Sequence, residues 1–248
     1  MPPVVTTEQL GQGVVQLTMH DREHKNGFSA QLVGELFEAF LGCGRRTDCR
    51  AVIITGYDSY FCSGGTQGAL LSLQAGQGKF TDTTLYSLAL ECPVPVVSAM
   101  QGHGIGGGFV FGLFADFVVL SRESVYTTNF MRYGFTPGMG ATYVLPKKLG
   151  FALAEEMLLS ARTYRGAELE RRGIPFPVLP RMEVLAYARQ VAIEVADKPR
   201  ESLVTLKAHL VREIRGELGA TIAREVEMHE KTIHQPEVRE RIGKRFGL

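Results

Sequence analysis

The sequence predicts an α/β protein with a helical C-terminal region, and two observations support this fold class. Short β-branched segments that end at glycine or polar residues, as strands do, alternate with segments whose apolar residues recur at helical spacing. From Gly150 onward the chain changes to amphipathic segments alone. Such alternation favours parallel strand pairing in one α/β core. We therefore expect a single domain over 1–248.

The N-terminal half contains two strand–helix–strand units. In the first, a helix at 29–43 separates strands at 13–21 and 50–56. In the second, strands at 94–102 and 116–123 flank the segment "GGGFVFGLFA", which we expect to form a compact buried helix. Its glycines would allow close packing against neighbouring backbone.

The C-terminal third is predicted to consist of amphipathic helices. They are expected at 151–161, 181–197, 199–218 and 220–235. Neither a linker nor a repeat marks this region as a separate globule.

Composition limits the function classes. With 248 residues, 45% hydrophobic content and a formal net charge of +1, the chain gives no reason to expect nucleic acid or an anionic membrane as a partner. Its apolar stretches are interrupted before they reach membrane-spanning length. The four cysteines have no C-x-x-C spacing, and the N-terminus lacks the pattern of a signal peptide. We therefore expect a cytoplasmic protein.

The segment "QGHGIGGGF" (101–109) matches the G-x-G-x-x-G pattern of dinucleotide sites. It follows a predicted strand and opens a predicted helix, and Glu123 lies at about the distance of a ribose-binding acid. However, dinucleotide folds usually carry this pattern on their first strand. A nicotinamide-dependent oxidoreductase and a purely structural role in helix packing both remain open at this point.

A second segment, "TGYDSYFCSGGTQ" (55–67), also leads from a strand through a glycine turn toward a helix. The chain thus has two strand ends with exposed backbone N–H groups. Two such donors aimed at one point would stabilise the oxyanion of a thioester enolate.

At these residues the chain resembles the crotonase (enoyl-CoA hydratase/isomerase) superfamily. "FCSGG" is similar to its F-C-A-G-x turn, "QGHGIGGGF" to its N-G-x-x-x-G-G-G helix start, and "YGFTPGMGATYVLPKKLG" to its L-G-x-x-P-G-x-G segment. The resemblance implies a ββα spiral core over 1–190 and C-terminal helices over 191–248 that cover the active site and form a homotrimer, or a dimer of trimers. It also implies that the N–H groups of Gly65 and Gly107 form the oxyanion hole.

The departures from the family pattern indicate the reaction. Val110 and Phe130 occupy the positions of the two hydratase glutamates, and Thr66 stands where an aspartate is common. Without those carboxylates the site should not add water to an alkene. A dry pocket that stabilises an enolate suits decarboxylation, because loss of CO2 supplies the electrons and needs no external base.

Three ionisable residues are candidates for proton transfer or pocket roles. His229 falls on the apolar stripe of the last predicted helix, Lys79 lies in a glycine-bracketed loop, and His103 lies inside the glycine motif. Each also has a structural interpretation: a buried histidine bonded to a carbonyl, a solvated lysine, and a histidine at a helix start.

The segments around these residues are similar to the decarboxylases of polyketide β-branching cassettes. This resemblance implies catalysis by Lys79 and His229 on 3-methylglutaconyl bound to the 4′-phosphopantetheine of an acyl carrier protein, giving 3-methylcrotonyl and CO2. No metal or other cofactor is implied. Some relatives have a tyrosine four residues before the lysine, where this chain has Ala75. The alternatives are an enoyl-thioester hydratase or isomerase and a non-catalytic acyl-thioester-binding homologue.

Overall fold

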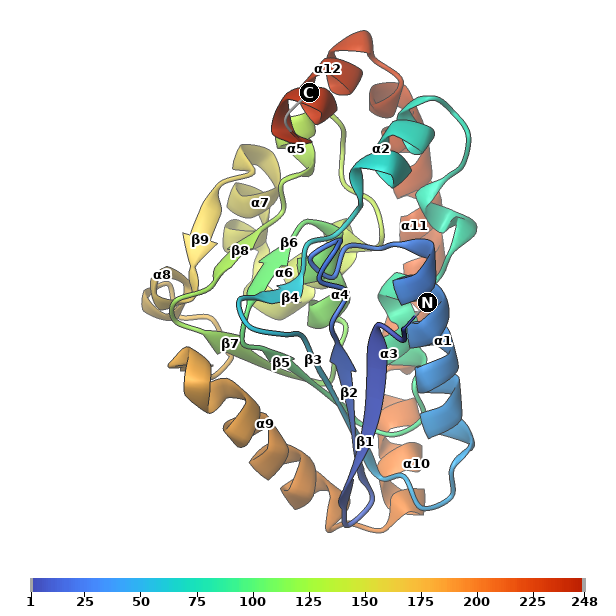
Figure 1. Cartoon of the computed structure of the whole chain (residues 1–248), viewed down its shortest axis with the longest axis vertical. Helices are drawn as coiled ribbons and strands as arrows, with labels where there is room; N and C mark the ends of the chain where they lie inside the picture. Colours follow the sequence, from blue (N-terminus) through green and yellow to red (C-terminus); the bar gives the residue numbers. More distant parts are fainter. Residues whose placement is uncertain (1, 247–248) are drawn as a thin grey trace.

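The computed structural model describes residues 2–246 and contains two β-sheets (Figure 1). The larger sheet has the order β1 (Val5–Gly11), β2 (Val14–Met19), β3 (Ala51–Thr55), β5 (Val96–Met100), β7 (Phe117–Ser121) and β10 (Val178–Leu179). The smaller has the order β4 (Tyr60–Cys62), β6 (His103–Ile105), β8 (Val125–Thr127) and β9 (Thr163–Arg165). Pairing is parallel except at β1–β2 and β8–β9.

A ββα unit repeats three times along the chain. Each unit places its first strand in the larger sheet and its second in the smaller one before a helix begins. The units are β3–β4–α2, β5–β6–α4 and β7–β8–α5, with α2 at Gln67–Gln74, α4 at Gly107–Leu113 and α5 at Phe130–Tyr133. The predicted α/β class and its ββα spiral core are confirmed.

The inner strands of the larger sheet are covered on both faces. Every residue of β3 and β5 is buried, which explains their uninterrupted apolar sequence. Helix α9 (Arg181–Ala196) packs on one face, where Ala188, Ala192 and Ala196 recur every four residues and allow close approach. The main core lies on the other face, under α1 (Ala30–Arg45), whose first turn is capped by Ser29.

One boundary among the predicted C-terminal helices differs in the structure, and several of the remaining helices were not predicted. The remaining helices are η1 (Phe80–Asp82), η2 (Leu85–Ser87), α3 (Leu88–Glu91), α6 (Ala141–Leu149), α7 (Phe151–Ser160), α8 (Gly166–Arg171), α10 (Arg200–Leu210), α11 (Arg212–Ile233) and α12 (Pro236–Phe246). The predicted break near 219 is wrong, and the break lies at Val211 instead. Leu218 and Thr221 on either side of Gly219 are both buried, so tertiary packing holds the helix through the glycine.

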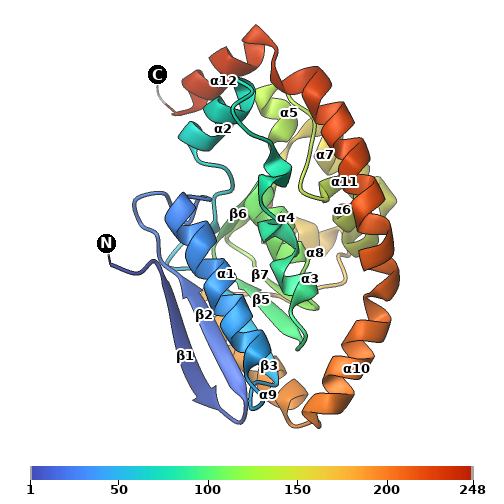
Figure 2. The ribbon, with the colours of Figure 1, turned by 90° about the vertical axis from the view of Figure 1, so that its right-hand side faces the viewer.

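The C-terminal helices run back along the core of the same chain (Figure 2). Lys207 of α10 is buried, and its ammonium group donates to the carbonyl oxygens of Ala89 and Val94 and to the Asp116 carboxylate, at 2.7–3.0 Å. These bonds attach α10 beside α3 and β5, and α11 continues from there toward α2 and α5. None of the described helices is long and apolar enough to cross a membrane.

Candidate active site

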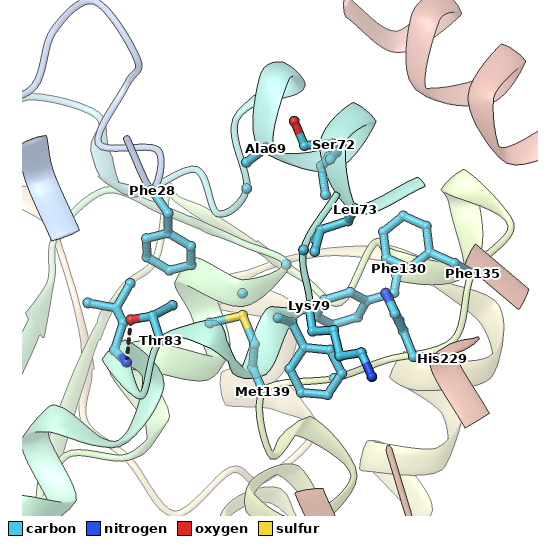
Figure 3. A pocket seen from close by; sticks show the side chains of 18 of the residues that line it. Phe28, Ala69, Ser72, Leu73, Lys79, Thr83, Phe130, Phe135, Met139 and His229 are labelled. Carbon is cyan, nitrogen blue, oxygen red and sulfur yellow. Dashed lines mark hydrogen bonds between the residues drawn. The ribbon is translucent and has the colours of Figure 1, made fainter. Parts of the chain in front are cut away.

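A cavity of about 300 Å³ lies where α2, the loop 78–85, α5 and α11 meet. Its wall is mostly apolar, and its larger side chains include Phe28, Leu70, Phe80, Phe130, Phe135 and Met139. Figure 3 shows Lys79 and His229 on one side of this pocket and Phe28 on the other. An acyl chain would therefore meet a dry wall with two basic groups.

The three short parallel strands of the smaller sheet deliver one part of the wall each. β4 is followed by Ser63 and Gly65, β6 by Gly106 and Gly107, and β8 by Asn129 and Phe130, and all six residues line the cavity. Parallel strands end at the same edge of a sheet, so segments distant in sequence converge there.

Both predicted oxyanion donors follow a glycine with positive φ. Gly64 has φ +79° and Gly106 has φ +54°. A Cβ at Gly64 would lie 2.6 Å from the Ile105 carbonyl oxygen and 3.2 Å from the nitrogen of Gly107, so the two loops approach each other closely. Within the described residues, neither Gly65 nor Gly107 has an acceptor for its N–H.

The local structure explains why these N–H groups are unpaired. Gly107 is the first residue of α4, where amide groups have no partner within the helix. Thr66 caps α2 by accepting a hydrogen bond from the N–H of Ala69 at 3.3 Å, so the chain turns into the helix directly after Gly65. Two unpaired donors beside one apolar cavity can bind an oxyanion.

His229 is 6% exposed and its ring is fixed by three neighbours. Nδ1 lies 2.9 Å from the carbonyl oxygen of Thr136, and the rings of Phe80 and Phe135 pack edge-on at 5.3 and 5.2 Å. Because a carbonyl only accepts, Nδ1 carries the hydrogen in the neutral ring and Nε2 has the lone pair. Nε2 is buried and has no hydrogen-bond partner in the described part of the chain.

Burial also sets the charge of this histidine. It lowers the pKa of His229 below the ordinary value of 6.5, against the opposing effect of the hydrogen bond to Thr136. The ring is therefore neutral at pH 7 in the absence of a ligand. Nε2 can accept a proton, but it must gain one before it can donate.

Lys79 belongs to a short loop that packs against α11. Its backbone N–H donates to the Asp82 carboxylate at 2.8 Å, and the neighbouring Phe80 contacts His229. The Lys79 side chain is exposed yet lines the cavity, and no acceptor bonds to its ammonium group among the described residues. A free cation is thus available at the cavity wall.

Two residues predicted for the pocket do not line it. Val110 is fully buried one turn into α4, so it packs in the core behind Gly107. His103 lies in β6 and not at a helix start; its Nδ1 accepts a hydrogen bond from the N–H of Val125, and its ring packs on Tyr60. The short strand β6 points this side chain away from the cavity.

Several lining residues were missed by the sequence analysis. Tyr133, Asn129 and Met139 line the cavity, and Tyr133 stacks on Phe135 with ring centroids 5.6 Å apart. Burial raises the pKa of the Tyr133 hydroxyl. The position of Asn129 directly after a parallel strand was the available signal, because residues after such strands gather at one edge.

The glycine motif has packing roles in this fold. A Cβ at Gly102 would lie 2.4 Å from the backbone nitrogen of Tyr60, and one at Gly104 would lie 3.2 Å from the Tyr126 ring. The Glu123 carboxylate is bonded to the Ser121 hydroxyl and to the N–H of Arg181. These contacts account for the pattern that suggested a dinucleotide. No group of three or more potential metal ligands occurs among residues 2–246.

Comparison with known proteins places this site in a family. Residues 9–245 match the model of the enoyl-CoA hydratase/isomerase family. The chain is 60% identical over 244 residues to the bacillaene synthase decarboxylase PksI of Bacillus subtilis, with 98% of each chain covered. A probable enoyl-CoA hydratase of Rhodobacter capsulatus is 28% identical over 89% of this chain and 86% of its own length.

Solved structures agree with this placement. A structure from a dehydratase/decarboxylase enzyme couple of polyketide β-branching superposes with a TM-score of 0.97 at 59% identity, covering 99% of this chain and 100% of the other. The ECH2 decarboxylase domain of CurF from Lyngbya majuscula gives 0.95 at 45% identity and the same coverage. The chain therefore belongs to the enoyl-CoA hydratase/isomerase (crotonase) family, close to the decarboxylases of polyketide β-branching.

Proposed function

We propose that this protein decarboxylates 3-methylglutaconyl carried on an acyl carrier protein, giving 3-methylcrotonyl and CO2. The observation that carries the proposal is one apolar cavity lined by Gly65, Gly107, Lys79 and His229, with Phe130 at a position where hydratases have glutamate. The carboxylate that does line it in the described chain, Asp82, is bonded to the N–H of Lys79. The site therefore lacks the pair of carboxylates that hydratases use to add water.

The thioester oxygen would lie between the N–H groups of Gly65 and Gly107. When the bond to the distal carboxylate breaks, its electron pair moves through the double bond onto that oxygen, giving a dienolate. Donors fixed before the reaction need no reorganisation, and each typically contributes about 3–4 kcal/mol to such a transition state. The positive φ of Gly64 and Gly106 fixes both donors.

Lys79 would hold the carboxylate at the opposite part of the cavity. An ammonium group has three donors and pairs with a carboxylate, which favours binding of the charged substrate. The apolar wall around Phe130 and Phe135 keeps water from the leaving CO2. Pairing with Lys79 orients the group that departs.

One proton must be added to carbon in each turnover, and His229 or Lys79 supplies it. A neutral His229 first takes a proton at Nε2, which a bound carboxylate next to it favours, and then transfers it to the dienolate. Lys79 has its proton from the start. Solvent restores the proton afterwards, so the sum is one carboxylate and one proton converted into one C–H bond and CO2.

The partner and assembly belong to the same proposal. The substrate would arrive on the 4′-phosphopantetheine of a polyketide synthase carrier protein, and the protein would form a homotrimer, or a dimer of trimers, in the cytoplasm. Large apolar side chains exposed on the described surface support an assembly; they include Phe151, Leu159, Met182, Leu206 and Leu210. Four free, buried cysteines fit a reducing compartment.

Intact mass spectrometry in D2O tests the reaction. A carrier protein loaded with 3-methylglutaconyl should lose the mass of CO2, and the released acyl group should contain one deuterium bound to carbon. A gain of the mass of water would instead identify a hydratase. An unchanged mass with retained binding would identify a non-catalytic homologue.

A further inference from the structure

A buried carboxylate lies one helical turn before His229. Glu225 of α11 is 2% exposed, and its Oε2 accepts a hydrogen bond from the N–H of Gly140 at 2.7 Å. Its Oε1 accepts from the N–H of Thr142 at 2.8 Å and from the Thr142 hydroxyl at 2.5 Å. No cation pairs with Glu225 in the described chain. The start of α6 therefore provides all of its partners.

Burying a charged carboxylate costs free energy unless hydrogen-bond donors are held around it. Burial raises the pKa of Glu225, and the hydrogen bonds from Gly140 and Thr142 at the start of α6 offset part of that cost. The bonds are correspondingly directional: moving α11 along or around its axis would break them together. Glu225 thus fixes the position of α11 relative to α6.

The same stretch of chain is held by two other residues of α11. His229 donates to the carbonyl oxygen of Thr136, and Thr232 bonds to the N–H and hydroxyl of Thr136 at 3.1 and 3.0 Å. Glu225, His229 and Thr232 are spaced i, i+4 and i+7, so they lie on one face of the helix. The segment 136–142 that they hold contains Gly138 and Met139 of the cavity wall.

We propose that Glu225 is a positioning residue for the reaction: by anchoring α11 to the start of α6, it holds the His229 ring in place at the cavity wall. Glu225 does not line the cavity, so it acts through His229. This role rests on the proposed decarboxylation. Loss of the anchor should affect the chemical step more than substrate binding, because Lys79 and the oxyanion donors lie on other elements.

Glu225→Gln tests the role, since the amide cannot accept from all three donors. Glu227→Gln is the matched control, because Glu227 is exposed on the same helix and makes no described side-chain contact. We expect kcat of Glu225→Gln to fall about tenfold to a hundredfold, as displacement by about an ångström can cost. KM should stay within about threefold, because Lys79 and the oxyanion donors lie on other elements, and Glu227→Gln should match the wild type.

Nitrogen NMR of the imidazole separates positioning from a general loss of structure. In the wild type the His229 signals should report Nδ1–H and an unprotonated Nε2; in Glu225→Gln this preference should weaken. Because this readout needs no turnover, it tests the anchor even if the wild type proves inactive, and wild-type turnover tests the reaction separately. If Glu225→Gln does not fold, the same measurements are made on Thr142→Val, which removes only the hydrogen bond from the Thr142 hydroxyl to Glu225. Unchanged kcat and unchanged His229 signals in a folded variant would overturn the proposal.

Discussion

The carbonyl oxygen of Thr136 lies 2.9 Å from Nδ1 of His229 and thereby decides which imidazole nitrogen keeps its lone pair. The donor Nδ1–H is used by the backbone, and Nε2 is left buried without a described partner. A neutral, oriented imidazole beside a lysine is suited to take up a proton when a carboxylate enters.

The low pKa of His229 predicts acid sensitivity of the fold. Its folded pKa lies below the unfolded value of 6.5, so the unfolded chain binds more protons between the two values. The stabilisation is complete above about pH 6.5 and is lost as pH falls toward the folded pKa. The free energy of unfolding, measured with urea, should therefore decrease less for His229→Gln than for the wild type between about pH 7 and pH 5. Equal losses would contradict the depressed pKa.

Removal of the Lys79 charge should abolish most turnover without unfolding the protein. Lys79→Met keeps the apolar stem and deletes the group proposed to hold the carboxylate. We expect kcat/KM for CO2 release to fall about 10²- to 10⁴-fold, the usual range for a group that transfers or holds a proton. Lys231→Met, an exposed change on α11, is the control. Wild-type turnover by Lys79→Met would remove Lys79 from the mechanism.

A methyl group at Gly107 should obstruct the cavity. A Cβ there would lie 2.7 Å from Sδ of Met139 and 3.0 Å from Phe28, which both line the cavity. Met139 can move, so Gly107→Ala should fold but bind acyl thioesters weakly. At Gly42 of α1 a Cβ meets nothing within 4 Å, and Gly42→Ala should raise stability by about 0.5–1 kcal/mol with normal turnover. Binding titrations and urea unfolding distinguish the two.

Lys207 should be important for stability and not for chemistry. Lys207→Met leaves two carbonyl oxygens and the Asp116 carboxylate without their buried donor, and such losses cost about 1–3 kcal/mol. Lys198→Met, at an exposed ion pair with Asp197, should change the unfolding free energy little. Equal effects of the two substitutions, measured by urea unfolding, would show that the buried ammonium does not hold α10 in place.

The sequence patterns predicted β2, β3, β5 and β7 of the larger sheet because these strands are almost entirely buried. β3 and β5 appear as short apolar runs for that reason, and α9 as an amphipathic helix. The patterns missed β1, which is mostly exposed, and β10, which has two residues. The strands β4, β6 and β8 have three residues each, too few for a periodicity, so strand β6 was not predicted and His103 was expected at the pocket or at a helix start. The break at Val211 was missed because it depends on packing and not on a glycine.

The candidate site was predictable where one element fixes the side chain. Helical spacing alone placed His229 on a buried face, whereas the assignment of Gly65 and Gly107 as oxyanion donors also needed the family resemblance. Residues that reach the cavity through tertiary packing were not predictable in this way. Tyr133 and Met139 are examples, as is Thr136, whose carbonyl oxygen orients the histidine. Val110 shows the converse, because the family resemblance placed it at the pocket, but it is fully buried and does not line the cavity.

The most direct test of the account is rapid-quench mass spectrometry of a carrier protein loaded with 3-methylglutaconyl, with wild-type, Lys79→Met and His229→Gln proteins in parallel. We expect the wild type to remove the mass of CO2 within the first turnover, and both variants to leave most of the loaded carrier intact over the same time. Conversion by both variants at the wild-type rate, or a loaded carrier that the wild type leaves unchanged, would contradict it.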